Sequence, residues 1–404
     1  MSVTGIEFLV LILLLSTFFH ALPSVSLRQA ALALLSLVFL CSLIQGWIPW
    51  LCLLVFLLSG YGVALALRRR PRRWLFWSYL VLLVSAFMLL KRYEFLGILI
   101  PAGWLAHTIS ILGLSYMLFR QIHFIVDMMQ GQIAHSSLLT YLYYQLNVFT
   151  LISGPIQRYA EFQGQWDSLD SVLERKHEVL GAYLRVLLGL LQVSLLGEFF
   201  YGLYETAVAD FEQARLLRIA KVFYGFPLYV YFNFSGYCNV VIGCASLLGV
   251  RLPENFDHPY LARNMIEYWN RWHITLSHWL RDYLFTPLYM AIARRWPKRS
   301  SSFASPCFFV VFLFAGVWHG STYNFVVFGL LNGVGVSAAK MWENWIVRHR
   351  GRSALRSYLA SRRIRLVANL LNLNFACVTF LFFPPGLEQC VAVIRSLVTG
   401  QPVS

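Results

Sequence analysis

Two histidines stand out because each lies in a segment where an ionisable side chain is costly. His319 sits between Trp318 and Gly320 at the end of an apolar stretch, and His273 lies in a segment rich in Trp and Tyr. Imidazole titrates near neutral pH, so it can take a proton from a hydroxyl and return it later. Because ionisable groups within membrane segments usually serve function, the pair predicts acid–base chemistry. The alternative for each histidine is a packed residue with a structural hydrogen bond.

Sequence signatures of other catalytic chemistries are absent from the chain. It has no paired-histidine zinc motif, no Gly-x-Ser-x-Gly nucleophile elbow, and no phosphate-binding or dinucleotide-binding glycine loop. Its seven cysteines are scattered singly, most of them in apolar runs. The sequence therefore predicts neither a disulfide framework nor a metal site.

Composition places these histidines in an integral membrane protein. Of 404 residues, 58% are hydrophobic and 13% are charged, whereas soluble domains carry about 25% charged residues. Apolar runs recur from residue 8 to residue 383, many of them near the roughly 20 residues that cross a bilayer. We expect one all-α, polytopic domain over residues 1–404, with roughly ten or eleven transmembrane helices.

The formal net charge of +15 is concentrated between apolar runs, at residues 68–73, 294–299 and 348–365. Lys and Arg gather in cytoplasmic loops of membrane proteins. The clusters therefore predict cytoplasmic segments, and counting spans back from the first cluster puts the N-terminus on the outer side. No groove-binding helix or nucleic-acid motif accompanies the charge, so we expect no nucleic-acid partner.

The segment 254–289 is too charged for a lipid-facing span and is crowded with aromatic residues. Read as one helix from about Met265, it would be amphipathic, because residues three and four apart share a face. The polar face would carry Glu267, Asn270, His273, Ser277 and Arg281. Such a helix lies in the membrane interface or enters the protein where water or substrate reaches it. Residues 156–178 are more polar and predict a surface loop.

Several motifs, in order along most of the chain, resemble bacterial members of the membrane-bound O-acyltransferase family. Tyr-Trp-Asn-Arg-Trp-His-Ile-Thr-Leu-Ser at 268–277, followed by Trp-Leu-Arg-Asp-Tyr at 279–283, resembles the first signature of that family. Gly-Val-Trp-His-Gly at 316–320 resembles the second, and the 46-residue separation of His273 and His319 also fits. Further matches lie at 113–116, 153–159, 234–237 and 253–256.

The resemblance implies an acyltransferase whose helices surround a central tunnel, with re-entrant or interfacial helices. A thioester, either acetyl-coenzyme A or an acyl carrier protein, would be the cytoplasmic co-substrate, and no bound cofactor is expected. The acceptor would be the hydroxyl of an extracytoplasmic cell-envelope glycan or a periplasmic acyltransferase partner. Membrane lipid would surround the protein in the bacterial cytoplasmic (inner) membrane.

The same resemblance assigns roles to residues. His319 would be the general base on the acceptor hydroxyl, and His273 a second catalytic residue. Asn270 or His273 could donate a hydrogen bond to the developing oxyanion. The residues expected to bind substrate are Trp318, Asn270, Trp269, Trp272 and Arg281.

Two acyl groups and one rival function stay open at this point. The opening residues 5–9 resemble the polysaccharide-acetylating branch, which favours acetyl. The compact length and the residues at 255–257 resemble the D-alanylating branch, a close second. Asn233 and Asn332 depart from the common pattern of both. The rival is a transporter or flippase for a lipid-linked glycan or acyl donor, whose buried histidines would couple proton movement; the lack of inverted repeats disfavours it.

Overall fold

The computed structural model describes residues 4–98, 113–169, 176–209, 215–297, 300–384 and 386–399. This described part is helical, and its one β-type pairing is an isolated bridge between Phe256 and Trp272. The all-α prediction is therefore confirmed. By its internal contacts the chain forms two compact units. The first unit comprises Met1–Arg92, Leu96–Val193 and Phe234–Pro253, and the second Tyr93–Phe95, Ser194–Asn233 and Glu254–Ser404. The single domain expected over residues 1–404 stays a prediction.

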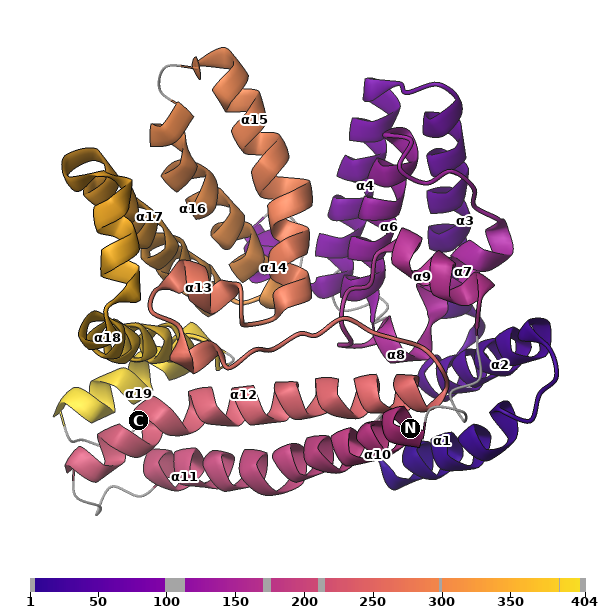
Figure 1. Cartoon of the computed structure of the whole chain (residues 1–404), viewed down its shortest axis with the longest axis horizontal. Helices are drawn as coiled ribbons and strands as arrows, with labels where there is room; N and C mark the ends of the chain where they lie inside the picture. Colours follow the sequence, from indigo (N-terminus) through magenta and orange to yellow (C-terminus); the bar gives the residue numbers. More distant parts are fainter. Residues whose placement is uncertain are drawn as a thin grey trace. The chain divides into compact units, whose positions relative to one another are not determined.

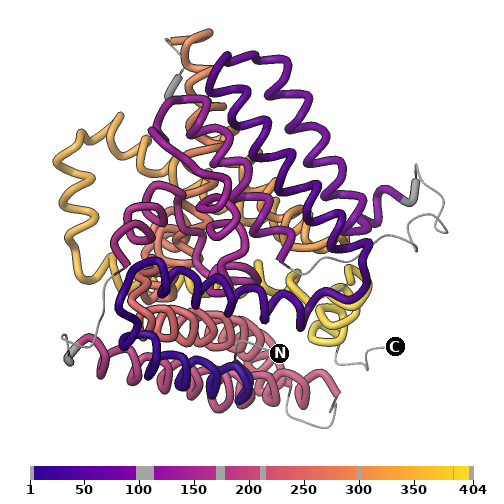
Figure 2. Tube along the Cα trace, turned by 90° about the vertical axis from the view of Figure 1, so that its right-hand side faces the viewer, coloured from indigo at the N-terminus to yellow at the C-terminus, as the bar shows by residue number. Residues whose placement is uncertain are grey.

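The first unit is built on a layer of three helices, α3, α4 and α6, which lie side by side (Figure 1, Figure 2). The side chains of Ser24 and Ser137 cap two of its helices by accepting the backbone N–H groups of Leu27 and Thr140. Its helices are α1 (Ile6–Phe19), α2 (Val25–Leu43), α3 (Trp47–Arg69), α4 (Arg73–Lys91), α6 (Leu114–Met129), α7 (Leu138–Leu146), α8 (Val148–Leu151), α9 (Tyr159–Asp167), α10 (Lys176–Leu191) and the second half of α12 (Arg215–Leu247). The π-helical η2 (Gln192–Gly197) follows α10.

The second unit holds both candidate histidines. Its central pair is α16 and α17, joined by a short turn and packed along their length (Figure 1). Its elements are η1 (Glu94–Ile98) in part, α11 (Glu198–Ala209), the first half of α12, η3 (Pro259–Leu261), α13 (Met265–Trp269), α14 (Ile274–Leu280), η4 (Arg281–Phe285), α15 (Thr286–Arg295), α16 (Ser300–His319), α17 (Tyr323–Ala360), α18 (Arg362–Phe380) and α19 (Leu387–Thr399). Helix α11 packs against α12 through aromatic pairs such as Tyr201–Tyr229, with ring centroids 4.7 Å apart.

Five segments of the described chain are long and apolar enough to cross a membrane: α2, α3, α4, the stretch Glu178–Ala209, and α17. Two shorter apolar helices, Ile6–Phe19 and Phe303–His319, accompany them. Many large apolar side chains on these helices face outward, for example Val55, which is 58% exposed. Such surfaces suit lipid rather than water. The protein is thus a membrane protein, while the total of ten or eleven spans stays a prediction.

The prediction of one amphipathic helix from Met265 is wrong. Helix α13 ends at Trp269, and α14 starts only after His273, whose backbone is left-handed with φ 44° and ψ 53°. The break arises because residues 271–274 pair with the backbone of residues 255–257 instead of continuing the helix. The polar residues expected on one face therefore belong to separate short elements.

The surface loop expected at 156–178 is also partly wrong, because α9 and the start of α10 lie within it. Helix α9 forms because Phe162 and Trp166, four residues apart, both bury their rings. The side chain of Glu161 accepts the backbone N–H of Arg158 at 3.5 Å at the start of this helix.

Candidate active site

His273 is held by the amide side chain of Asn255. Its Nδ1 lies 3.2 Å from Asn255 Oδ1, and the same oxygen accepts the backbone N–H of Thr275 at 3.1 Å and its hydroxyl at 2.9 Å. The backbone adds a further bond, from the N–H of Ile274 to the carbonyl of Asn255 at 2.9 Å. We call these residues, 255 and 273–275, the Asn255 nest. It fixes the imidazole in one position, with only 1% of the residue exposed.

The nest also fixes the tautomer of His273. The backbone N–H of Thr275 can only donate, so the atom of Asn255 that it meets must be the carbonyl oxygen. Because this oxygen can only accept, Nδ1 of His273 must carry the proton that it donates to Asn255. Burial, together with repulsion from the neighbouring His319, holds the pKa of His273 well below its ordinary value. The ring is therefore neutral at pH 7 and presents Nε2 as a lone-pair acceptor.

A network of charged side chains rigidifies the backbone that leads into the nest. Glu267 accepts from Arg263 at 2.7 Å and from Arg271 at 2.8 Å. Burial alone would raise the pKa of Glu267, but its hydrogen bonds to Arg263 and the charges of both arginines outweigh this effect and lower it. The N–H of Asp257 donates to the carbonyl of Arg271 at 2.9 Å, which closes the loop. Residues 263–273 therefore form one braced turn.

His319 is the last residue of α16, where Gly320 ends the helix. Its ring contacts Trp318, with centroids 4.9 Å apart, Phe328 at 5.7 Å and Phe383 at 5.5 Å. Trp318 lies in turn 6.4 Å from the ring of His273. The two histidines thus flank one indole, and their catalytic role stays a prediction. The atom Nε2 of His319 is buried and lies among aromatic rings.

The turn after His319 is fastened by a segment that lies far away in sequence. The hydroxyl of Tyr93 donates to the carbonyl of Val317 at 2.8 Å. The N–H of Glu94 donates to the carbonyl of Ser321 at 3.0 Å, and the Glu94 carboxylate accepts the N–H of Tyr323 at 3.2 Å. A carboxylate at the first turn of α17 also suits the positive end of the helix dipole. Neither residue was singled out from the sequence.

Trp269 and Trp272 were expected to bind substrate, and the structure places both in an aromatic core. Trp272 stacks on Tyr268 at 5.6 Å and meets Phe256 at 5.1 Å and Phe380 at 5.3 Å. Trp269 packs on Phe312 and donates its indole N–H to Asn332 at 3.2 Å. Their contacts support the fold around the histidines.

Asn270 and Arg281 lie outside this core. Asn270 caps the end of α13 and is exposed. Arg281, also exposed, pairs with Asp282 at 2.8 Å in η4. Of the residues predicted for the site, the structure brings together His273, Trp318 and His319. Asn255 joins these residues in the site. It belongs to the motif at 253–256, but its role as the acceptor for His273 depends on the pairing of residues 255–257 with 271–274.

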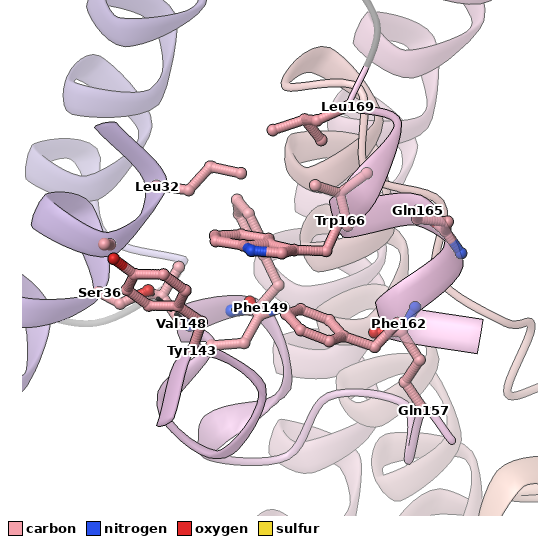
Figure 3. A pocket seen from close by; sticks show the side chains of 13 residues that line it. Leu32, Ser36, Tyr143, Val148, Phe149, Gln157, Phe162, Gln165, Trp166 and Leu169 are labelled. Atoms are coloured by element: carbon pink, nitrogen blue, oxygen red, sulfur yellow. Dashed lines mark hydrogen bonds between the residues drawn. The ribbon is translucent and has the colours of Figure 1, made fainter. Parts of the chain in front are cut away.

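The first unit contains a separate pocket, drawn in Figure 3, which encloses about 440 Å³ including open space. A wall of aromatic rings lines it, with Trp166 stacked on Phe162 at 5.3 Å and tilted against Tyr143 at 4.7 Å. The side chains of Gln157, Gln165 and Leu32 also line it. None of the predicted site residues lines this pocket.

Most of the chain matches a known protein family. Residues 74–382 match the model of the membrane-bound O-acyltransferase family. The chain is 27% identical over 333 residues to a teichoic acid D-alanyltransferase of Bacillus subtilis, a match that covers 81% of this chain and 82% of that protein. It is 30% identical over 261 residues to a peptidoglycan O-acetyltransferase of Helicobacter pylori, covering 63% of this chain and 45% of that one. A probable alginate O-acetylase of Pseudomonas aeruginosa is 27% identical over 260 residues, with 60% and 47% covered.

Proposed function

The chain belongs to the membrane-bound O-acyltransferase family, and on that premise we propose that it moves an acyl group from a thioester to a hydroxyl of a cell-envelope glycan, with His319 as the general base. The observation that carries the proposal is the position of His319. It ends an apolar helix, its Nε2 is buried, and the indole of Trp318 separates it from a second, neutral histidine.

The reaction needs one proton to be moved twice. His319 takes the proton of the acceptor hydroxyl, and the oxygen attacks the thioester carbonyl. The carbon–sulfur bond then breaks, and the protonated imidazole returns the proton to the leaving thiolate. The products are an ester and a free thiol, so the reaction needs no metal or redox cofactor. A positioned general base typically raises the reaction rate about 10²- to 10⁴-fold.

We assign His273 a positioning role instead of the oxyanion contact considered from the sequence. A neutral ring with its proton on Nδ1 has no N–H to offer at Nε2, and burial opposes a second proton. The lone pair on Nε2 can instead accept a hydrogen bond from the substrate hydroxyl or a water. Trp318, whose buried indole lies beside both rings, is the better candidate for an oxyanion donor.

For the acyl group we propose D-alanyl. The opening residues favour acetyl, but the extent of the matches favours D-alanyl. The D-alanyltransferase match covers about four-fifths of both chains, whereas the O-acetyltransferase matches cover less than half of those proteins. Teichoic acid is what the first relative modifies by name, and a related envelope polymer is our proposed acceptor. The donor would be a carrier-bound thioester at the inner face of the cytoplasmic membrane, with the N-terminus on the outer face.

The test uses the purified protein in proteoliposomes with a radiolabelled acyl thioester and isolated envelope glycan. His319→Gln should form no detectable ester, because glutamine can hydrogen-bond but has no basic nitrogen. His135→Gln, at an exposed histidine of the first unit, is the matched control and should retain full activity.

Near-normal ester formation by His319→Gln would remove His319 from the role of base. If the wild-type protein moved labelled glycan across the bilayer without forming ester, the transporter reading would replace the enzyme. D-alanyl and acetyl thioesters are compared in parallel, and a higher kcat/KM with acetyl would reverse our choice of acyl group.

A further inference from the structure

The segment 348–365 joins the end of α17 to the start of α18, and we call it the basic strap. It contains seven arginines, all exposed: Arg348, Arg350, Arg352, Arg356, Arg362, Arg363 and Arg365. The sequence holds no Asp or Glu between Glu343 and Glu388. Within the part of the chain that the structure describes, the strap arginines form no ion pair. The strap is therefore a concentrated and uncompensated positive surface.

Helix geometry places this charge at the level of lipid headgroups. Helix α17 starts at Tyr323 as a candidate membrane span and keeps its helical course to residue 350. At about 1.5 Å per residue, Trp342 lies roughly 28 Å from the start of the helix, close to the roughly 30 Å thickness of the hydrocarbon layer. Arg348 and Arg350 lie roughly 9–12 Å further along, within the headgroup region.

Aromatic residues mark the same level. The rings of Trp342 and Trp345 stack with centroids 5.2 Å apart and are 48% and 43% exposed. Tryptophan gathers at membrane–water interfaces, where its ring meets the lipid and its N–H the water. The exposed side chains of Ile364 and Leu366 repeat the combination of apolar and cationic groups where α18 begins.

Two breaks in the helical backbone keep the strap arginines near the headgroup region. Gly351, with φ 80° and ψ 170°, breaks the helix directly after Arg350. A second break follows at Ser361, whose side chain caps α18. Between the two breaks, Arg263 donates to the carbonyl of Leu359 at 2.8 Å and ties the strap to the braced turn near His273. Figure 2 draws this stretch in gold at the margin of its unit.

We propose that the basic strap is a binding surface for anionic phospholipid headgroups, which anchors the end of α17 and the start of α18 to the membrane surface. An acidic protein could also be attracted to such charge. The lipid is the better occupant because the arginines directly follow a membrane span and are interleaved with exposed tryptophan and aliphatic side chains. A protein interface would not require that alignment with the bilayer.

The experiment measures how strongly phosphatidylglycerol raises the Tm of the full-length protein in zwitterionic detergent micelles, since a ligand of the folded state stabilises it. Each arginine near an anionic surface contributes about a fivefold change in affinity. Arg348→Gln/Arg350→Gln should therefore weaken phosphatidylglycerol binding about 25-fold. Arg348→Lys/Arg350→Lys keeps the charge and should bind nearly as the wild type does. Arg251→Gln is the matched control, because Arg251 is exposed but already faces Glu178 at 3.6 Å.

Further controls test whether the rise in Tm comes from the anionic headgroup of the lipid. Phosphatidylcholine of the same chain length and soluble glycerol phosphate should leave Tm unchanged, and added salt should abolish the shift. An unchanged phosphatidylglycerol affinity in the double Gln variant would overturn the proposal. If that variant instead lost affinity for an acidic acyl carrier protein while keeping its lipid affinity, the surface would belong to a protein partner. None of these readouts depends on acyl transfer, so the result is independent of the proposed function.

Discussion

Replacing Gly316 with alanine should lower activity, because the added methyl group would push α16 away from α17 where the two helices pack closely. A methyl group at this position would lie 2.3 Å from the carbonyl oxygen of Phe325 and 2.6 Å from Cα of Gly329. Both are backbone atoms of the α16–α17 pair, and ordinary contact begins at 3.4 Å. The helices must therefore part by roughly 1 Å, and such overpacking costs about 1–3 kcal/mol. His319 lies one turn further along α16, and a shift of about 1 Å at a catalytic group lowers the rate about 10²-fold.

The assay compares the Tm in detergent with the kcat of ester formation in proteoliposomes. Gly202→Ala is the control, because this glycine of α11 has open space where the methyl would go. That change should stabilise the helix by about 0.5–1 kcal/mol and leave kcat unchanged. If Gly316→Ala lowered Tm but kept full kcat, the position of His319 would not depend on the crossing. An unchanged Tm would refute the close approach itself.

The remaining predictions concern the Asn255 nest. Asn255→Ala removes the acceptor of three buried donors, so it should cost about 2–4 kcal/mol of unfolding free energy; chemical denaturation measures this, and a loss below about 1 kcal/mol would contradict the described contacts. The depressed pKa of His273 means that the unfolded chain binds its proton more readily, so its contribution to stability is complete above about pH 6.5 and declines as the pH falls towards the folded-state pKa. His273→Asn, which tolerates the left-handed backbone and does not titrate, should flatten the pH dependence in that window by up to about 1.4 kcal/mol per pH unit. Equal slopes for the two proteins would exclude His273 as the source.

Apolar runs were sufficient to predict most of the helices. An apolar run at residues 49–67 lies in α3 (Trp47–Arg69), and the apolar stretch that ends at His319 lies in α16 (Ser300–His319). These features are local, since burial of a continuous apolar stretch in lipid leaves the backbone little choice but a helix. His273 and His319 were singled out from their sequence motifs, and the structure places both rings beside Trp318.

What could not be predicted depends on contacts between distant residues. The left-handed backbone of His273 could not be predicted locally, because it accompanies the pairing of residues 255–257 with 271–274. Spacing by three and four therefore gave one helix where two exist. Tyr93 reaches the carbonyl of Val317 across 224 positions, a contact that no periodicity indicates. Asn270 and Arg281 were grouped with His273 by that same helical spacing, and the break in the helix separated them.

The Asn255 nest has a consequence for the order in which the protein is made. Its partners lie within 20 positions of one another, so a short loop closes it with little loss of chain entropy. Domains and their parts form from the N-terminal side during synthesis. All residues of the nest are therefore translated 44 positions before His319. Helix α16 follows the nest in the chain, so His319 joins His273 only after every residue of the nest has been made.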